Sequence, residues 1–278
     1  MTAVPFSLRR VWLIACVTAL EAARQRVFHL VLVLAMGLVL GAHAFREFNF
    51  GASEMKFMAD FGFGALTVFG SVLTIVATAQ LFFGELEHRT ALTLLAKPVW
   101  RAEFILGKIG GVMAVVTVFC ALVTLLLLGT LYFRQQTLLA EHPELSESAR
   151  ALDPMAIIAV GVANWLKFGV LAALTLLIAS FARTSLYAVI VGFVMLLICH
   201  LHPLARLASA RTDSWLLRGV AGMVSLIFPD FQLFDLSASI DSVGAAGAAS
   251  LIRLVAYAGL YFSVLGSLAV YSFNRREL

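Results

Sequence analysis

The sequence predicts an all-α integral membrane protein with six transmembrane helices and an N-terminal amphipathic helix at the membrane surface. Of its 278 residues, 62% are hydrophobic and only 13% are charged, whereas a soluble domain has about 25% charged residues. The apolar residues come in runs long enough to cross a hydrocarbon core of about 30 Å as helices. No repeat is visible and no outer loop is large enough for a substantial domain, so residues 1–278 are expected to form one transmembrane domain.

The N-terminal segment predicts a helix that lies on the membrane. Arg9 and Arg10 precede the apolar run VWLIACVTAL, which Glu21, Arg24 and Arg26 interrupt before a full-length span follows. This pattern favours an uncleaved surface helix over a cleaved signal peptide. The residues expected to face the lipid are Val11, Trp12, Ala15 and Ala19.

Basic residues set the predicted topology. The six spans are about 27–45, 61–84, 109–133, 155–181, 185–203 and 250–273. With both termini inside, the inner segments hold Arg9, Arg10, Arg24, Arg26, Arg89, Lys97, Arg101, Lys108, Arg183, Arg275 and Arg276. The longer outer loops hold only Arg46, Lys56, Arg134, Arg150, Arg206, Arg211 and Arg218. The positive-inside rule therefore predicts cytoplasmic termini.

A short outer element is expected before the last span. Within residues 204–249, the apolar stretch from Gly219 to Phe228 ends at Pro229. It is too short to span, which predicts a re-entrant or interfacial helix.

Polar residues in the spans mark a possible transport path. Four hydroxyls of the second span fall within roughly 60° of arc on one helix face: Thr67, Ser71, Thr74 and Thr78. Such a stripe either lines a polar path or packs with hydroxyls bonded back to the helix.

Lys167 is the one charge well inside a predicted span, and Asn164 precedes it by one turn. If the hydrocarbon part of this span extends about 20 residues back from Ala182, Lys167 lies about 8 Å below the outer surface. The side chain could snorkel to that surface or point inward, where it would face an anionic group.

Enzyme motifs are missing from the sequence. It has no GxxxxGK[ST] phosphate loop, no HExxH and no GxSxG, so no ATP or metal site of those kinds is expected. The three cysteines are scattered in apolar surroundings without a CxxC pair, and so predict neither a disulfide framework nor a zinc site. His200 and His202 are two residues apart and point to different helix faces, which favours interfacial histidines over metal ligands.

Small residues allow close helix packing in two spans. Gly37 and Gly41 form GxxxG in the first span, and Gly259, Ser263 and Gly266 share a face of the last. Such faces favour helix association, either within the chain or between subunits.

The charged stretch between the second and third spans reads GELEHRTALTLLAKPVWRAEFILGK, residues 84–108. Its composition favours a helix from Glu85 to Ala96, with acids in the first turn, and Pro98 ends that helix. By the predicted topology this short helix lies across the cytoplasmic surface.

This stretch resembles the inner loop of ABC-2-type permeases, with an acid, Arg-Thr, Leu-Leu, Pro-Val-x-Arg-x-Glu and Gly-Lys in that order. FPDFQLFDL at 228–236 is similar to the family's segment before the last span, and the terminal FNRREL to its usual ending. Within the family, the chain looks most like six-span permeases associated with multi-copper enzyme maturation, a likeness that does not establish copper as the substrate.

The resemblance implies a transport subunit rather than an enzyme. It would work in the bacterial cytoplasmic (inner) membrane with a second permease, as a homodimer or heterodimer, and with two copies of a cytoplasmic ABC ATPase that bind ATP and Mg. A periplasmic accessory protein is compatible with it, no nucleic acid is expected, and export is the usual direction. The expected coupling residues are Glu85, Glu87, His88, Arg89, Thr90, Arg101 and Glu103.

Two other classes of function stay open at this point. One is a membrane-embedded enzyme that uses His200, His202, Asp230 or Asp235, and would act without nucleotide. The other is a membrane anchor that recruits a complex without transport. The basic residues of the inner segments could also serve solely to anchor the ends of the spans. Anchoring, however, does not require the order of residues found in 84–108.

Overall fold

The computed structural model describes residues 6–44, 54–87, 100–141, 154–211, 219, 222, 228–236 and 245–275. Within these ranges all regular structure is helical, so the predicted all-α class is confirmed. The elements are α1 (Leu8–Arg24), α2 (Arg26–Gly41), α3 (Glu54–Glu87), α5 (Arg101–Glu141), α6 (Pro154–Phe181), α7 (Ser185–Arg211), the 3-10 helix η3 (Phe231–Phe234) and α9 (Ala245–Asn274).

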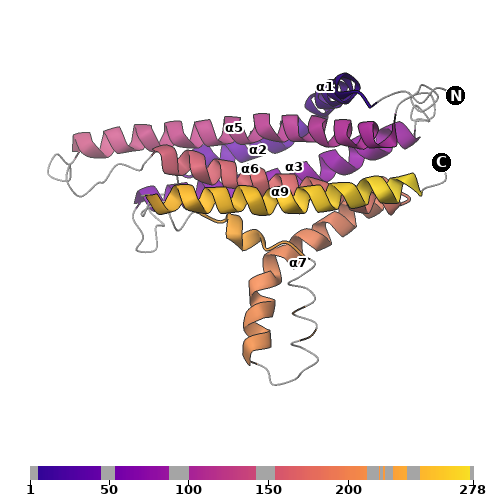
Figure 1. Ribbon diagram of the computed structural model, residues 1–278. Coiled ribbons are helices and arrows are strands. Elements are labelled where there is room, and N and C mark those ends of the chain that lie inside the picture. Colours follow the sequence, from indigo (N-terminus) through magenta and orange to yellow (C-terminus); the bar gives the residue numbers. More distant parts are fainter. Residues whose placement is uncertain are drawn as a thin grey trace.

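The long helices form one bundle with α6 at its centre. Figure 1 shows α3, α5, α6 and α9 running side by side, and α6 contacts each of the other three as well as α7. The sequence of α6 explains its place, because small residues alternate with large apolar ones and let neighbours approach on every side. Phe168, Leu171 and Ala172 are fully buried there.

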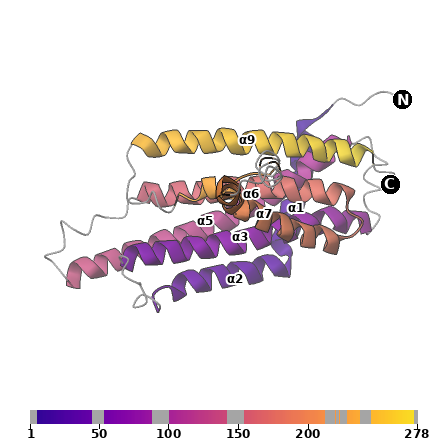
Figure 2. The same cartoon turned by 90° about the horizontal axis from the view of Figure 1, so that it is seen from below.

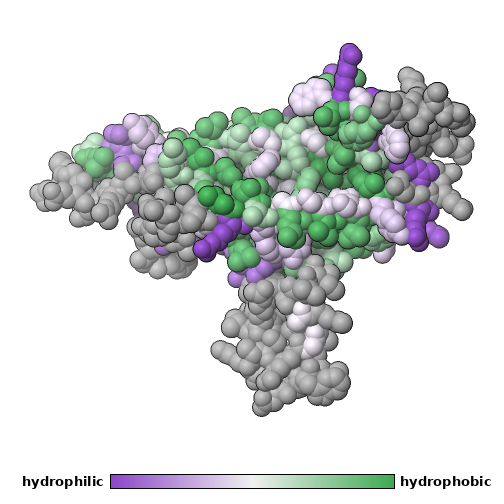
Figure 3. Space-filling view, viewed as in Figure 1, coloured by the Kyte–Doolittle hydropathy of each residue, from purple (hydrophilic) through white to green (hydrophobic). Residues whose placement is uncertain are grey.

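Four described helices are long and apolar enough to cross a membrane, namely α3, α5, α6 and α9. A fifth is present if α1 and α2, which are bent by 64° at their junction, are counted as one span. Hydrophobic residues cover most of the bundle's side in Figure 3, and hydrophilic residues gather at the end where α9 terminates. The membrane class is thus confirmed, while the count of six, with spans at 27–45 and 185–203, stays a prediction.

Helix α1 lies across the bundle. Figure 1 shows it nearly end-on while the long helices are seen from the side. The extended backbone of Gln25 separates it from α2. Trp12 is exposed, as predicted for a lipid-facing residue. The same expectation is wrong for Ala15 and Ala19, because Ala15 packs against α5 and Ala19 against the core.

Helix α7 follows the bundle only in part. Figures 1 and 2 show that its C-terminal portion leaves the other helices. Pro203 lies in this region, and proline in a helix interior removes a hydrogen bond and bends the axis. The short helix η3 packs against α6 and α7. Most of the predicted re-entrant element before the last span lies outside the described residues.

Candidate functional site

Glu103 caps the helix in which it lies. Trp100 precedes the first residue of α5, and its backbone N–H donates to Oε2 of Glu103 at 3.1 Å. A glutamate at the third helical position that accepts from the residue before the helix forms half of a capping box. This contact between residues three positions apart fixes the carboxylate at the start of α5.

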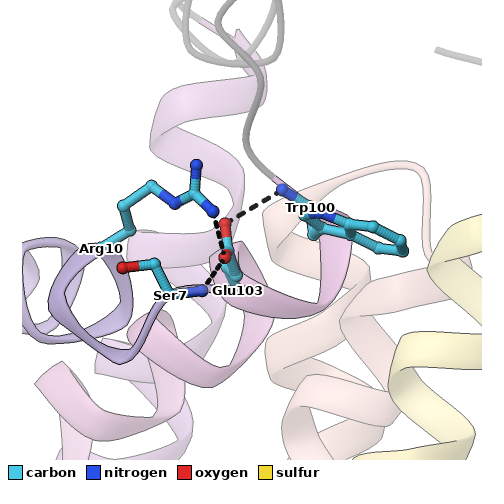
Figure 4. A network of polar contacts seen from close by, with 4 residues as sticks. All are labelled: Ser7, Arg10, Trp100 and Glu103. Carbon is cyan, nitrogen blue, oxygen red and sulfur yellow. Dashed lines mark hydrogen bonds and ion pairs between the residues drawn. The ribbon is translucent and has the colours of Figure 1, made fainter. Parts of the chain in front are cut away.

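The same carboxylate holds the N-terminal helix. Figure 4 shows Oε1 of Glu103 accepting from the backbone N–H of Ser7 at 2.7 Å and from Nη2 of Arg10 at 2.9 Å. Ser7 is the N-cap residue of α1, and Glu103 has no exposed surface. Hydrogen bonds in which one partner is ionised are the strong class of hydrogen bond. We call these four residues, Ser7, Arg10, Trp100 and Glu103, the Glu103 clamp.

Arg101 ties the same end of α5 to the last helix. Its Nη1 donates to the carbonyl oxygen of Phe273 at 3.1 Å, and its guanidinium lies 5.9 Å from the centre of that ring. A carbonyl in the last turn of a helix has no partner within the helix, so Arg101 satisfies such an acceptor of α9. Phe273 is itself buried and stacks on Phe104.

The predicted coupling residues divide into two groups. Arg101 and Glu103 bind partners within the chain, at the junction of α5 with α1 and α9. The helical backbone of α3 continues through Glu85 and Glu87. The side chains of these two residues, together with His88, Arg89 and Thr90, lie outside the described part of the chain.

A second group of polar residues lines a cavity of about 410 Å³ between α3, α6, α7 and η3. We call it the Lys167 pocket. Its polar lining residues are Asp60, Thr67, Asn164, Lys167, His200, Gln232 and Asp235. Its apolar lining includes Phe231 and Phe234 of η3.

Lys167 points into this pocket. It stands about 20 Å from either end of α6 and is 5% exposed. Its Nζ lies 3.0 Å from Nε2 of His200 and 5.6 Å from the centre of the Phe231 ring. Of the two orientations that the sequence left open, this geometry matches the inward one.

Three of the six residues proposed to line a path meet in this pocket. They are Thr67, Asn164 and Lys167. The hydroxyl of Thr67 donates to Oδ1 of Asn164 at 2.9 Å, which joins α3 to α6. The other three, Ser71, Thr74 and Thr78, are buried outside this pocket and donate to carbonyls of α3 one turn back, as the packing alternative predicts.

A comparison with models of known protein families identifies the family of this chain. The model described as ABC-2 family transporter protein matches residues 11–278, nearly the whole chain. The chain belongs to this family. A comparison with curated proteins gave no match. This ABC-2 protein is therefore a membrane subunit of the transporter class that partners an ABC ATPase subunit.

Two residues of these sites in the ABC-2 chain, His200 and Arg10, have partners that the sequence did not indicate. His200 was expected to be an interfacial histidine, and Arg10 a topology signal. Each has its partner far along the chain, 33 residues away for His200 and 93 for Arg10, so local pattern carried no signal. A signal did exist for the docking of α1, because Gly107 and Gly111 in α5 form a GxxxG pattern against Ile14 and Thr18.

Two residues of the enzyme alternative, Asp230 and His200, make contacts within the chain. Oδ1 of Asp230 accepts from the backbone N–H of Gln232 and caps η3. His200 contacts Lys167. Among the described residues no group of three His, Cys, Asp or Glu side chains is placed to hold a metal ion.

Proposed function

We propose that this protein is the permease subunit of an ATP-driven exporter of the bacterial inner membrane, with both termini in the cytoplasm. Two copies of an ABC ATPase would bind where α3 ends and α5 begins, and they would hold the ATP and Mg. The family match over residues 11–278 supports the permease role.

The Glu103 clamp is the observation that carries the coupling proposal. The predicted coupling helix, Glu85–Ala96, ends just before Trp100, where the clamp begins. A push on that helix by an ATPase would be passed to the start of α5. Glu103 then connects α5 to α1, and Arg101 connects it to α9. Because these contacts are partly buried and charge-assisted, the three helices would move together.

The predicted coupling helix begins at Glu85, within the last turn of α3, and α3 lines the Lys167 pocket. Asp60 and Thr67 of α3 face residues of α6 across this pocket. A movement of α3 relative to α6 would therefore change the shape of the pocket. We propose that the pocket is part of the transport path.

Pairing with a second permease would use small-residue faces that the chain leaves unfilled. A Cβ added at Gly37, Gly41, Gly259 or Gly266 would meet no described atom within 4 Å. Helix α9 is also the least buried of the four span candidates. Close approach at such faces stabilises helix pairs in membranes.

The test co-expresses this chain with its partner ABC ATPase and measures co-purification. Replacing Glu87 and Arg89 together with alanine should lower co-purification of that ATPase on the order of tenfold, since interface hot spots cost 2 kcal/mol or more. The matched control is Arg183→Ala, an exposed arginine of the other predicted inner loop. Equal co-purification for all three proteins would contradict the docking assignment.

A further inference from the structure

The Lys167 pocket contains a buried ammonium group whose charge the chain balances only in part. Lys167 is 5% exposed, and its only hydrogen-bond partner among the described residues is His200. Asp235, on an exposed residue that also lines the pocket, acts on it electrostatically. An ammonium group taken from water needs a paired charge or several hydrogen bonds. A neighbouring histidine and an aromatic ring supply less than that.

The hydrogen bonds of His200 show that it does not balance the charge. Its Nδ1 lies 2.9 Å from the carbonyl oxygen of Leu196, which can only accept, so Nδ1 carries the proton. The lone pair of Nε2 then accepts from the ammonium of Lys167 at 3.0 Å. His200 is therefore neutral in this arrangement. It orients Lys167 but contributes no negative charge.

Charges within the pocket are segregated by depth. Its two carboxylates, Asp60 and Asp235, are on exposed residues, whereas Lys167 and Asn164 are buried. Asn164 donates one amide N–H to Val160 and accepts from Thr67, so its amide orientation is set and a second N–H is left as a donor. The deep end thus offers hydrogen-bond donors and a positive charge, which suits an anion.

The wall of the pocket continues to the outside of the bundle at membrane depth. Val68 lines the pocket and is 59% exposed, and it lies near the middle of α3. Phe231, Phe234 and Val160 add apolar surface. An amphiphile could therefore place its polar end at Lys167 while its apolar part lies along this wall.

We propose that the Lys167 pocket binds the anionic headgroup, a phosphate or carboxylate, of an amphiphilic molecule from the membrane. Lys167 would donate to the anionic oxygens, His200 would orient Lys167, and the second amide N–H of Asn164 would add a donor. This assignment goes beyond the proposed function, and it rests on that function only where the bound amphiphile is taken as the transported substrate.

The proposal is tested by binding to the full-length protein in detergent, without nucleotide or ATPase. Native mass spectrometry would compare dioleoylphosphatidylglycerol with dioleoylphosphatidylcholine, which has the same chains but no net charge. The wild type should retain the anionic lipid about tenfold more strongly, and Lys167→Met should remove this preference, since tenfold corresponds to one charge-assisted hydrogen bond. Equal retention of both lipids by the wild type would overturn the proposal.

Two variants control for charge and for folding. Arg253→Met also removes one cation, from an exposed position on α9, and should keep the preference. Lys167→Arg keeps the positive charge and should keep most of the preference for the anionic lipid. Retention of the preference in this variant separates loss of charge from misfolding. Loss of the preference in Arg253→Met as well would indicate that any surface cation attracts the anionic lipid, and it would overturn the assignment of the site to Lys167.

Inorganic phosphate distinguishes a lipid headgroup from a soluble anion. Displacement of phosphatidylglycerol only by large excesses of phosphate supports an amphiphile. Displacement at equal concentrations would overturn the membrane source. The lipid-binding assay contains no ATPase, so a failure to bind lipid leaves the ATPase docking test unaffected. A failure of ATPase docking likewise leaves the lipid-binding result unaffected.

Discussion

Two buried charges in this protein have opposite surroundings. Glu103, at the end of the bundle where α5 begins, receives hydrogen bonds from Ser7, Arg10 and Trp100 and has no exposed surface. Lys167, in the middle of α6, borders a cavity, and its one hydrogen-bond partner among the described residues is a neutral histidine. The first charge is satisfied by the chain itself, and the second is satisfied only in part.

The difference separates a structural role from a binding role. A carboxylate with three donors has little capacity left for a ligand, so Glu103 is suited to join helices. An ammonium beside a cavity retains donors and charge that a ligand can use. The comparison also shows why Glu103, although it lies in the stretch that resembles the coupling loop, is better suited to transmit movement than to contact an ATPase.

Removing Glu103 should have the largest effect on stability. Glu103→Ala takes one acceptor from three donors, two of them at helix ends, and should cost about 2–4 kcal/mol. The expected result is a clearly lowered midpoint of thermal denaturation in detergent, followed by tryptophan fluorescence. The contrasting variant is Lys167→Met, because replacing a buried charge by an apolar residue of similar volume is often neutral. Equal losses of thermal stability in both variants would contradict the different roles assigned to the two charges.

The docking of α1 on α5 can be disturbed without touching the clamp. A Cβ at Gly111 would lie 2.8 Å from the carbonyl oxygen of Ala15 and 2.5 Å from Cβ of Thr18. Gly111→Ala should therefore push α1 away and cost about 1–3 kcal/mol. Gly129→Ala, in the same helix but with open space around it, should stabilise by up to about 1 kcal/mol. Similar denaturation midpoints for the two variants would argue against this close packing.

The smallest effects on stability are expected for the hydroxyl groups of α3. Thr67→Val removes the hydrogen bond to Asn164 while keeping the shape of the side chain, and should cost about 1 kcal/mol. Thr78→Val removes only a bond to the preceding turn of the same helix and should cost less. The same denaturation assay measures both, and a larger loss for Thr78→Val would contradict the assigned roles.

Parts of both sites could be predicted from the sequence. Lys167 stood out because a charge in a long apolar segment is costly, and Asn164 and Thr67 were proposed beside it. The hydroxyls of Ser71, Thr74 and Thr78 share a helix face with Thr67, yet periodicity alone does not say which part of that face borders a cavity. Glu103 was assigned to the coupling region from the resemblance, and its contact with Arg10 had no local signal.

The class of this protein follows from its sequence alone. Long apolar runs demand helices in a membrane, because lipid offers no partner for backbone polar groups, and the order of residues in 84–108 indicated the family that the comparison confirmed. The tertiary structure alone decided which charges meet. Hydropathy and helix period are properties of one segment, whereas the pairing of Glu103 with Arg10 and of Lys167 with His200 depends on how deep each helix sits and which face it turns to its neighbours.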